Sequence, residues 1–247
     1  MFSESTAQAG GGAEHASSRS TSLQRAFQRT LPIVLGYLPV GFAYGVLAQK
    51  TGLSTFNAVA MSVLVFAGSA QLIAVGLFAS GAGAASIIMT TFVVNLRHLL
   101  MSAALAPHVR SWRKTEQGLF AFQLTDETFA LHAGNFPKGV PVKAEAFSVN
   151  VIAQSAWIGG SVLGVLASGL IADVKPIGLD YALPAMFIAL LVAQVDSWAK
   201  LLAGVTAGAV SVGLLLAGVQ QMNVIVATVA AATLGLGVES WISKRSS

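Results

Sequence analysis

The chain has 247 residues, and its charged residues are 14 Lys+Arg and 10 Asp+Glu, far below the share of about 25% that soluble domains carry. With 55% hydrophobic residues and a mean hydropathy of +0.73, its polar residues are too few to cover a soluble surface, so lipid is the expected solvent. The absence of Cys excludes disulfides and thiolate metal sites, and four scattered His argue against zinc; we expect no metal and no cofactor. Because the basic residues are dispersed, we expect no nucleic-acid partner.

The first 22 residues are rich in Ser, Ala, Gly and Thr and lack hydrophobic periodicity, which predicts a disordered N-terminal tail. Residues 23–30 resemble a short interfacial helix, in which Arg25 and Arg29 lie four residues apart. We expect residues 23–247 to form one transmembrane domain. No nucleotide-binding or hydrolase motif of a soluble enzyme occurs, so an enzymatic function is not expected.

A helix that crosses a bilayer needs about 20 mostly apolar residues. Splitting the uncharged stretches at Gly-rich or polar breaks gives eight candidates, residues 31–49, 54–79, 84–105, 117–136, 146–171, 177–195, 201–219 and 223–242. The predicted fold is therefore an all-α, polytopic membrane helix bundle with about seven or eight transmembrane helices, some broken or kinked.

The distribution of basic residues favours a cytoplasmic N-terminus only weakly. With that orientation eight basic residues of the loops fall inside and five outside, and the basic cluster from Arg110 to Lys114 is on the wrong side. One early span is therefore re-entrant or broken. A faint similarity between residues 52–95 and 178–220 is compatible with an internal repeat and equally with chance composition.

Backbone breakers interrupt the first two spans. Pro39 lies in the middle of the first span, near Gly41, and a proline there removes a helical hydrogen bond. Gly68, Ser69 and Gln71 place small residues and an amide deep in the second span. Discontinuous helices expose backbone groups that bind substrates, so we predict a helix break near a site at these positions. For pairs such as Gly41 with Gly45, ordinary helix packing is the favoured interpretation.

Arg97 lies well inside the third span, where a charge is costly. Either it pairs with a buried carboxylate only to neutralise it, or its guanidinium binds the carboxylate of a small substrate. Asn95 and His98 are further candidates for this site, although Asn95 and Arg97 point about 200° apart on one ideal helix. Both therefore reach one cavity only if the helix is locally unwound.

Asp126 and Glu127 occupy the middle of the fourth span. Two carboxylates there cannot face lipid, so they contact protein or water. We interpret them as groups that bind substrate or carry a coupling proton; the alternatives are a protonated, hydrogen-bonded acid or a partly wet loop. Gln123 precedes them and completes the candidate set.

Four segments together resemble the AzlC family, the large subunits of bacterial branched-chain amino acid exporters. They are Pro39-x-Gly41-x-x-x-Gly45, Met61-Ser62 with Phe66 to Gln71, Asn95-Leu96-Arg97-His98, and Leu124-Thr125-Asp126-Glu127-x-Phe129-Ala130. The resemblance covers residues 31–136 with good specificity and continues more loosely to the C-terminus.

The resemblance implies a multi-pass permease of the bacterial inner membrane that exports Leu, Ile, Val or Met. It also implies coupling to the proton gradient and a small membrane partner of the AzlD type. The alternative is a non-transporting scaffold subunit that forms the pathway only with that partner. An intramembrane enzyme would need a nucleophile or metal beside the acidic pair, and the sequence offers neither.

Overall fold

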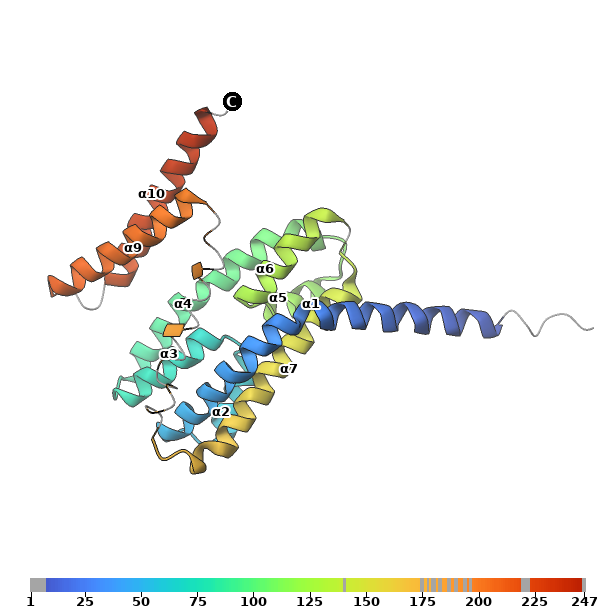
Figure 1. The fold of residues 1–247 in the computed structure, drawn as a ribbon, viewed down its shortest axis with the longest axis horizontal. Coiled ribbons are helices and arrows are strands. Elements are labelled where there is room, and N and C mark those ends of the chain that lie inside the picture. The colour runs from blue at the N-terminus through green and yellow to red at the C-terminus, as the bar shows by residue number, and fades with distance from the viewer. Residues whose placement is uncertain are drawn as a thin grey trace, which may run out of the picture. The chain divides into compact units, whose positions relative to one another are not determined.

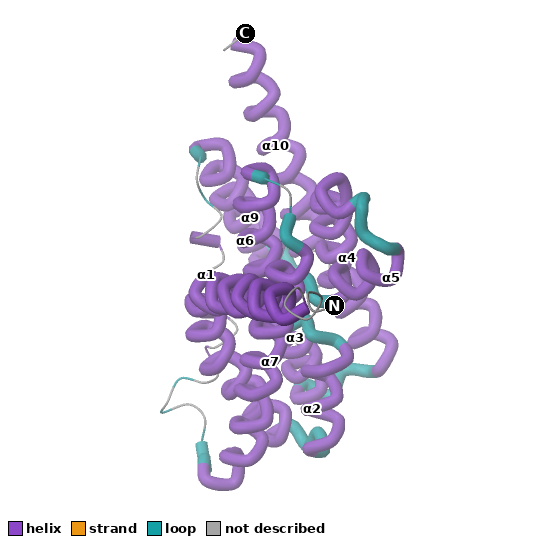
Figure 2. The backbone as a smooth tube through the Cα atoms, turned by 90° about the vertical axis from the view of Figure 1, so that its right-hand side faces the viewer, coloured by secondary structure: helices purple, strands orange, loops and turns teal. Residues whose placement is uncertain are grey.

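The computed structural model describes the backbone of residues 8–139, 141–173, 197–218 and 223–245, and isolated residues between 176 and 195. Side chains are described from Leu23 onward, except at 223–225, 228 and 239–245. These parts of the chain contain nine α-helices, three short 3-10 helices and loops. Figures 1 and 2 show how the helices and loops follow one another. The predicted all-helical class is confirmed.

The contacts divide the chain into two compact units, Met1–Leu183 and Pro184–Ser247, which are described separately. The first helix, α1 (Gln8–Lys50), extends back through residues 8–22, where irregular backbone was expected. The division into a tail and a single transmembrane domain stays a prediction.

Among the residues that the structure describes, four helical segments are long and apolar enough to cross a membrane: Leu23–Lys50, Ala84–Val109, Lys143–Leu170 and Trp198–Leu216. Within the first unit they correspond to α1, to α4 (Ala84–Leu105) with η1 (Ala106–Val109), and to α7 (Lys143–Ala167) with η3 (Ser168–Leu170). Many of their apolar side chains are exposed, for example Leu99 at 67% and Leu166 at 71%. Such a surface is suited to lipid, as expected for a multi-pass membrane protein.

Helices α1 and α7 run parallel to each other and pack backbone to backbone through glycines. A Cβ atom on Gly45 would lie 2.2 Å from the carbonyl oxygen of Ser161, and one on Gly164 would lie 2.0 Å from that of Phe42. Gly41 makes a similar approach to Trp157. Small residues at such a crossing allow the close contact that holds membrane helices together.

The helix break predicted at Pro39 and Gly41 is wrong, because α1 remains helical through both residues. Packing against α7 supports the helix there, and Gly41 serves this packing, as the alternative interpretation of the glycine pairs anticipated.

The second predicted span is two helices, α2 (Thr55–Leu64) and α3 (Gly68–Ala79). Ser54 caps the start of α2, and the chain turns at the buried Phe66, whose φ of 43° lies in the left-handed region. Each helix is too short to cross a bilayer.

The fourth predicted span, residues 117–136, is likewise not one helix. It comprises α5 (Lys114–Phe122) and α6 (Asp126–Asn135), followed by η2 (Phe136–Lys138). Thr125 starts α6 as its N-cap and is joined to Thr128 by reciprocal side-chain to backbone hydrogen bonds. These bonds supply the partners that a new helix needs at its start. The two acidic residues therefore lie in the first turn of a short helix and not in mid-helix.

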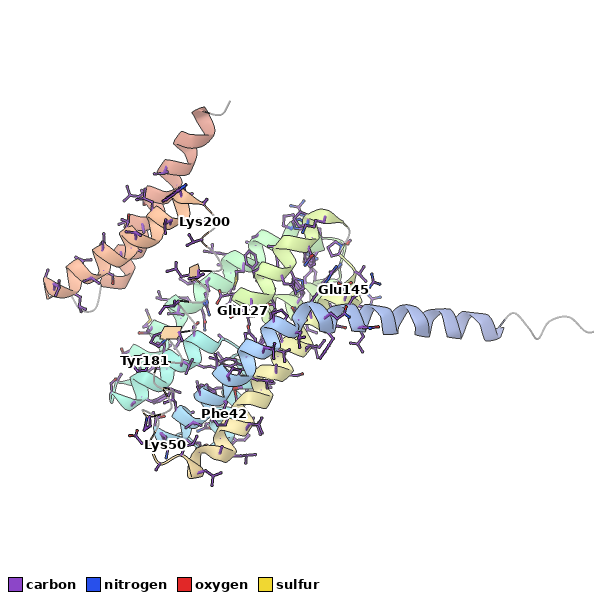
Figure 3. All side chains as sticks on the ribbon, viewed as in Figure 1. Phe42, Lys50, Glu127, Glu145, Tyr181 and Lys200 are labelled. Carbon is purple, nitrogen blue, oxygen red and sulfur yellow. The ribbon has the colours of Figure 1, made fainter. Side chains whose placement is uncertain are left out.

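The two pairs of short helices, α2 with α3 and α5 with α6, begin at opposite ends of the first unit. Gln49 at the end of α1 donates to Thr55 at the start of α2, so α2 and α3 form a hairpin at what we call the Lys50 end. Lys143 at the start of α7 binds Glu116 of α5 at 2.7 Å, so α5 and α6 form a hairpin at the other, Arg29 end. Figure 3 shows Lys50 and Glu145 at these two ends with Glu127 between them. Both hairpins turn near the middle of the unit.

In this arrangement the Arg110–Lys114 loop lies at the Arg29 end. The ammonium group of Lys143 lies over the ring of Trp112 in this loop, 5.9 Å from the ring centre. Between residues 23 and 171 the Arg29 end then carries seven basic residues, and the Lys50 end carries Lys50. The seven are Arg25, Arg29, Arg110, Arg113, Lys114, Lys138 and Lys143. The positive-inside rule now predicts a cytoplasmic Arg29 end, without the conflict of the eight-span prediction.

The second unit contains an antiparallel pair, α9 (Trp198–Leu216) and α10 (Asn223–Arg245), which pack side by side. They match the predicted spans 201–219 and 223–242. Most of the predicted span 177–195, and with it the first part of the possible repeat at 178–220, lies outside the described residues.

Candidate functional site

Arg97 lies on α4 between the turns of the two hairpins. Its Nη1 donates to Asp126 Oδ2, the first residue of α6, and its Nη2 donates to Ser69 Oγ near the start of α3. The side chains of Arg97 and Asp126 are 25% and 17% exposed. Ser69 lies 28 residues before Arg97 in the sequence and Asp126 lies 29 residues after it, and both contact its guanidinium.

The start of α3 is held in place by Trp157 of α7. A Cβ on Gly68 would lie 2.6 Å from Trp157 Cη2, so a larger residue at the start of this helix would displace the indole. The indole Nε1 in turn donates to Gln71 Oε1 at 3.0 Å. Gly68 therefore lets α3 begin close enough to α7 for Ser69 to reach Arg97.

Arg97 and the starts of two helices bring positive charge to this point, beside the carboxylates of the first turn of α6. The first turns of α3 and α6 present backbone N–H groups without helical partners, and each helix start acts as a partial positive charge. Arg97 adds a full charge beside them, and the carboxylate of Asp126 balances part of it. Such an arrangement favours an anion such as a carboxylate.

Glu127 is bound on the opposite side of the α6 start, by Tyr37 of α1. The Tyr37 hydroxyl is within hydrogen-bonding distance of Glu127 Oε2, at 2.5 Å, and of Thr125 Oγ1, at 2.6 Å. Since a hydroxyl has one proton, Tyr37 donates to the carboxylate and accepts from the threonine. Tyr37 carries no charge and no motif, so sequence reasoning missed it.

Gln123 lies in the turn of the second hairpin and is connected to the first. Its Nε2 donates to Gln154 Oε1 of α7 at 2.9 Å, and Gln154 Nε2 donates to the carbonyl oxygen of Val63 at 3.2 Å. The buried Gln123 Oε1 has no hydrogen-bond partner. Gln154 thus links the two hairpin turns. Its spacing of four residues from Asn150, which puts two amides on one face of α7, is the sequence signal that points to it.

Gln71 belongs to a different, fully buried network. Besides accepting from Trp157, it donates from Nε2 to Ser62 Oγ at 3.1 Å, and Ser62 donates to Ser161 Oγ at 2.8 Å. These bonds tie α2, α3 and α7 together. The structure therefore places Gln71 behind the Arg97 contacts and not among them.

Asn95 and His98 share α4 with Arg97 but do not join its hydrogen bonds. His98 Nδ1 pairs with the backbone oxygen of Asn95 at 3.2 Å, and Asn95 Oδ1 is buried without a partner. Helix α4 is continuous over these residues, so the local unwinding that would bring Asn95 and Arg97 together is not seen.

At the Arg29 end, the ion pair of Lys143 with Glu116 joins the start of α7 to α5. The hydrogen bond from Lys143 lowers the pKa of Glu116 below its ordinary value, with help from the backbone N–H of Arg113. Among the described residues no group of three or more His, Asp and Glu is arranged to hold a metal ion.

A polytopic helical protein whose two opposed half-helix hairpins meet at partly buried charges has the architecture of a membrane transport protein. Comparison with known proteins narrows this class: residues 32–171 match the family described as AzlC protein, and the chain belongs to that family. The predicted family is confirmed.

The relatives cover most of the chain. An uncharacterized membrane protein of Archaeoglobus fulgidus is 32% identical over 227 residues, 87% of this chain and 95% of the relative. The inner membrane protein YgaZ of Escherichia coli is 29% identical over 87% of this chain and 89% of its own. The branched-chain amino acid transport protein AzlC of Bacillus subtilis is 28% identical over 72% of this chain and 69% of its own. No solved structure matches.

The inner-membrane relative and the four candidate spans together confirm the predicted multi-pass location in the inner membrane.

Proposed function

We propose that this chain exports branched-chain amino acids across the inner membrane, driven by the proton gradient and assisted by a small membrane partner subunit of the AzlD type. The Bacillus subtilis relative named for branched-chain amino acid transport supports the substrate class. The single observation that carries the proposal is Arg97, held between the starts of α3 and α6 by Ser69 and Asp126.

The geometry suggests how an amino acid is bound. Its carboxylate replaces Asp126 on the Arg97 guanidinium, which is suited to two parallel hydrogen bonds with a carboxylate. The released Asp126 then accepts the substrate ammonium, so charges remain paired throughout. Phe66 and Trp157 pack around Tyr37 with ring centres 6.4 and 5.5 Å away, so the surroundings of this site on the α1 side are apolar.

Glu127 is the proposed proton carrier. It lies one residue from the substrate-binding Asp126 and is bound by the uncharged Tyr37, so it can take or release a proton without breaking the Arg97 pair. A change of charge on Glu127 is felt at the α6 start, where the substrate ammonium is bound. Proton movement and substrate release are thereby coupled through one helix start.

The hairpins also revise the number of crossings that we propose. Each hairpin replaces one crossing of the eight-span prediction, which leaves six crossings if residues 177–195 cross as predicted. Lys200, Lys244 and Arg245 then join the cytoplasmic side together with the Arg29 end, as the positive-inside rule requires.

The decisive measurement is efflux of labelled leucine, isoleucine, valine and methionine from cells that lack the chain and then regain it. Arg97→Gln should reduce efflux at least tenfold, and Arg97→Lys should not restore it, since lysine lacks the planar fork. Arg110→Gln, which removes an exposed basic residue of the same unit, is the matched control and should leave efflux unchanged. Full efflux with Arg97→Gln would refute the proposed site.

A scaffold role remains the second candidate, and the broad apolar faces favour it. In α9 none of the residues of the most apolar stretch is buried within the structure, and in α4 only 11% are. Either lipid or a partner subunit can cover such faces. Transport by the purified chain in liposomes without the small subunit would exclude the scaffold role, whereas transport only with it would favour it.

A further inference from the structure

A cavity of about 250 Å³ opens at the Arg29 end of the first unit. Its walls come from the end of α6, from η2, from the start of α7 and from Arg29 of α1. Its lining shares no residue with the Arg97 contacts. The cavity and the Arg97 site therefore lie at opposite ends of α6, a helix of ten residues.

The cavity contains both signs of charge. Arg29 Nη1 and Glu145 Oε1 form an ion pair at 2.5 Å, and the Glu145 side chain is only 13% exposed. Lys138 adds a second cation to the lining and makes no ion pair with another described residue. The lining therefore holds one cation more than anions, which leaves a position for a carboxylate, while Glu145 can accept an ammonium group.

The remaining wall is apolar and firm. Leu131, Phe136, Val142 and Val149 line it, and His132 contributes its ring. The ring is fixed because Nε2 donates to the buried Asn150 Oδ1 at 2.8 Å, while Phe120 and Phe136 pack on it with ring centres 5.1 and 4.9 Å away. A preformed apolar wall beside paired charges is the usual composition of a small-ligand site.

We propose that this cavity binds one free amino acid with an apolar side chain, in its zwitterionic form, as a loading site on the way to Arg97. Lys138 and Arg29 bind the carboxylate, Glu145 binds the ammonium, and the apolar wall receives the side chain. The volume lies below the range of about 300–1,000 Å³ that drug-sized ligands need, so a peptide or a nucleotide is too large. The inference rests on the proposed export of amino acids.

The position of the cavity agrees with export. The basic residues predict that the Arg29 end faces the cytoplasm, where an exporter must take up its substrate. From there α6 leads to Asp126 at its other end. The two sites are thus separated by the length of α6, and an amino acid released by Glu145 moves along this short helix to reach Arg97.

The test is leucine binding to the purified full-length chain, measured with labelled leucine. In an Arg97→Gln background, which silences the central site, leucine binding should persist. Adding Glu145→Gln should weaken it at least tenfold. Val142→Trp should abolish it, because Val142 is 56% exposed at the cavity and an indole there fills the space.

The matched control is Val151→Trp in α7, the helix that Val142 precedes as N-cap, since Val151 is 50% exposed and does not line the cavity. It should bind leucine like its parent. The ligand's two charges are tested by competition: 4-methylpentanoate lacks the ammonium and 3-methylbutylamine lacks the carboxylate. Each should compete at least tenfold more weakly than leucine.

Unchanged leucine binding in the Arg97→Gln, Val142→Trp double variant would overturn the inference, as would loss of all binding on Arg97→Gln alone. Equal competition by 4-methylpentanoate would overturn the zwitterion requirement. These outcomes are separable from the proposed function: export that survives Val142→Trp counts against the loading site alone. Cavity binding in a chain that exports no amino acid counts against the proposed export alone.

Discussion

At the residue scale, the candidate site contains charged residues that the sequence identifies and neutral residues that only their hydrogen-bond partners identify. Arg97, Asp126 and Glu127 were found from sequence because charges inside apolar stretches are costly and need an explanation. Ser69 was found as part of a break. Tyr37 was not found, because a neutral side chain on an apolar helix gives no signal until its partner is known.

Tyr37→Phe is expected to destabilise the protein, because it removes the donor that binds the carboxylate of Glu127. A hydrogen bond to a charged group contributes about 1.5–3 kcal/mol. Thermal unfolding of the purified variant in detergent measures the loss. Tyr181→Phe is the control, because that side chain is 67% exposed, and its change should stay within about 0.5 kcal/mol.

Gly68→Ala should reduce export several-fold, because the new methyl would lie 2.6 Å from Trp157 and must push the indole away from Gln71. The start of α3 then shifts, and Ser69 with it. Gly76→Ala on the same helix has nothing within 4 Å of its Cβ and should export normally. Equal export by the two variants would contradict the proposed role of the α3 start.

At the element scale, local helix caps decided where short helices begin, whereas packing between helices decided whether a helix continues through a proline. Thr125 with Thr128 and Ser54 with Asn57 are local caps that start α6 and α2. Pro39 is a local breaker, yet α1 continues through it, because the packing of α1 on α7 outweighs one missing hydrogen bond.

The α1 and α7 contact gives a sharp test. Gly45→Ala would put a Cβ 2.2 Å from the Ser161 carbonyl oxygen, and because this neighbour is backbone the helices must separate. We expect a loss of about 3 kcal/mol or more, the upper part of the range for overpacking. Gly36→Ala in the same helix meets nothing within 4 Å and should be neutral or stabilising by up to about 1 kcal/mol. Thermal unfolding compares the two.

At the scale of the whole molecule, the two opposed hairpins set the topology. Because the chain has no cysteine, single substitutions report the side of the membrane directly. Lys114→Cys and Lys138→Cys should be labelled from the cytoplasmic face by an impermeant thiol reagent, and Lys50→Cys from the opposite face. Labelling of Lys114→Cys together with Lys50→Cys would restore a complete crossing by residues 117–136.

The sequence by itself determined the class of protein, the candidate spans and the three buried charges. It did so because few charges, long apolar stretches and the cost of a buried charge are properties of composition and position alone. The loop at Arg110 to Lys114 already conflicted with eight crossings, but sequence could not say which span was re-entrant.

Only the tertiary structure decided that residues 54–79 and 117–136 are hairpins that meet at Arg97. A half-helix and a crossing helix have the same apolar composition, and they differ in what their ends contact. The contacts of Lys143 with Glu116, and of Arg97 with Ser69 and Asp126, join residues 27 to 29 positions apart, which local patterns do not encode. The same packing brings Arg29, Lys138 and Glu145 to one cavity.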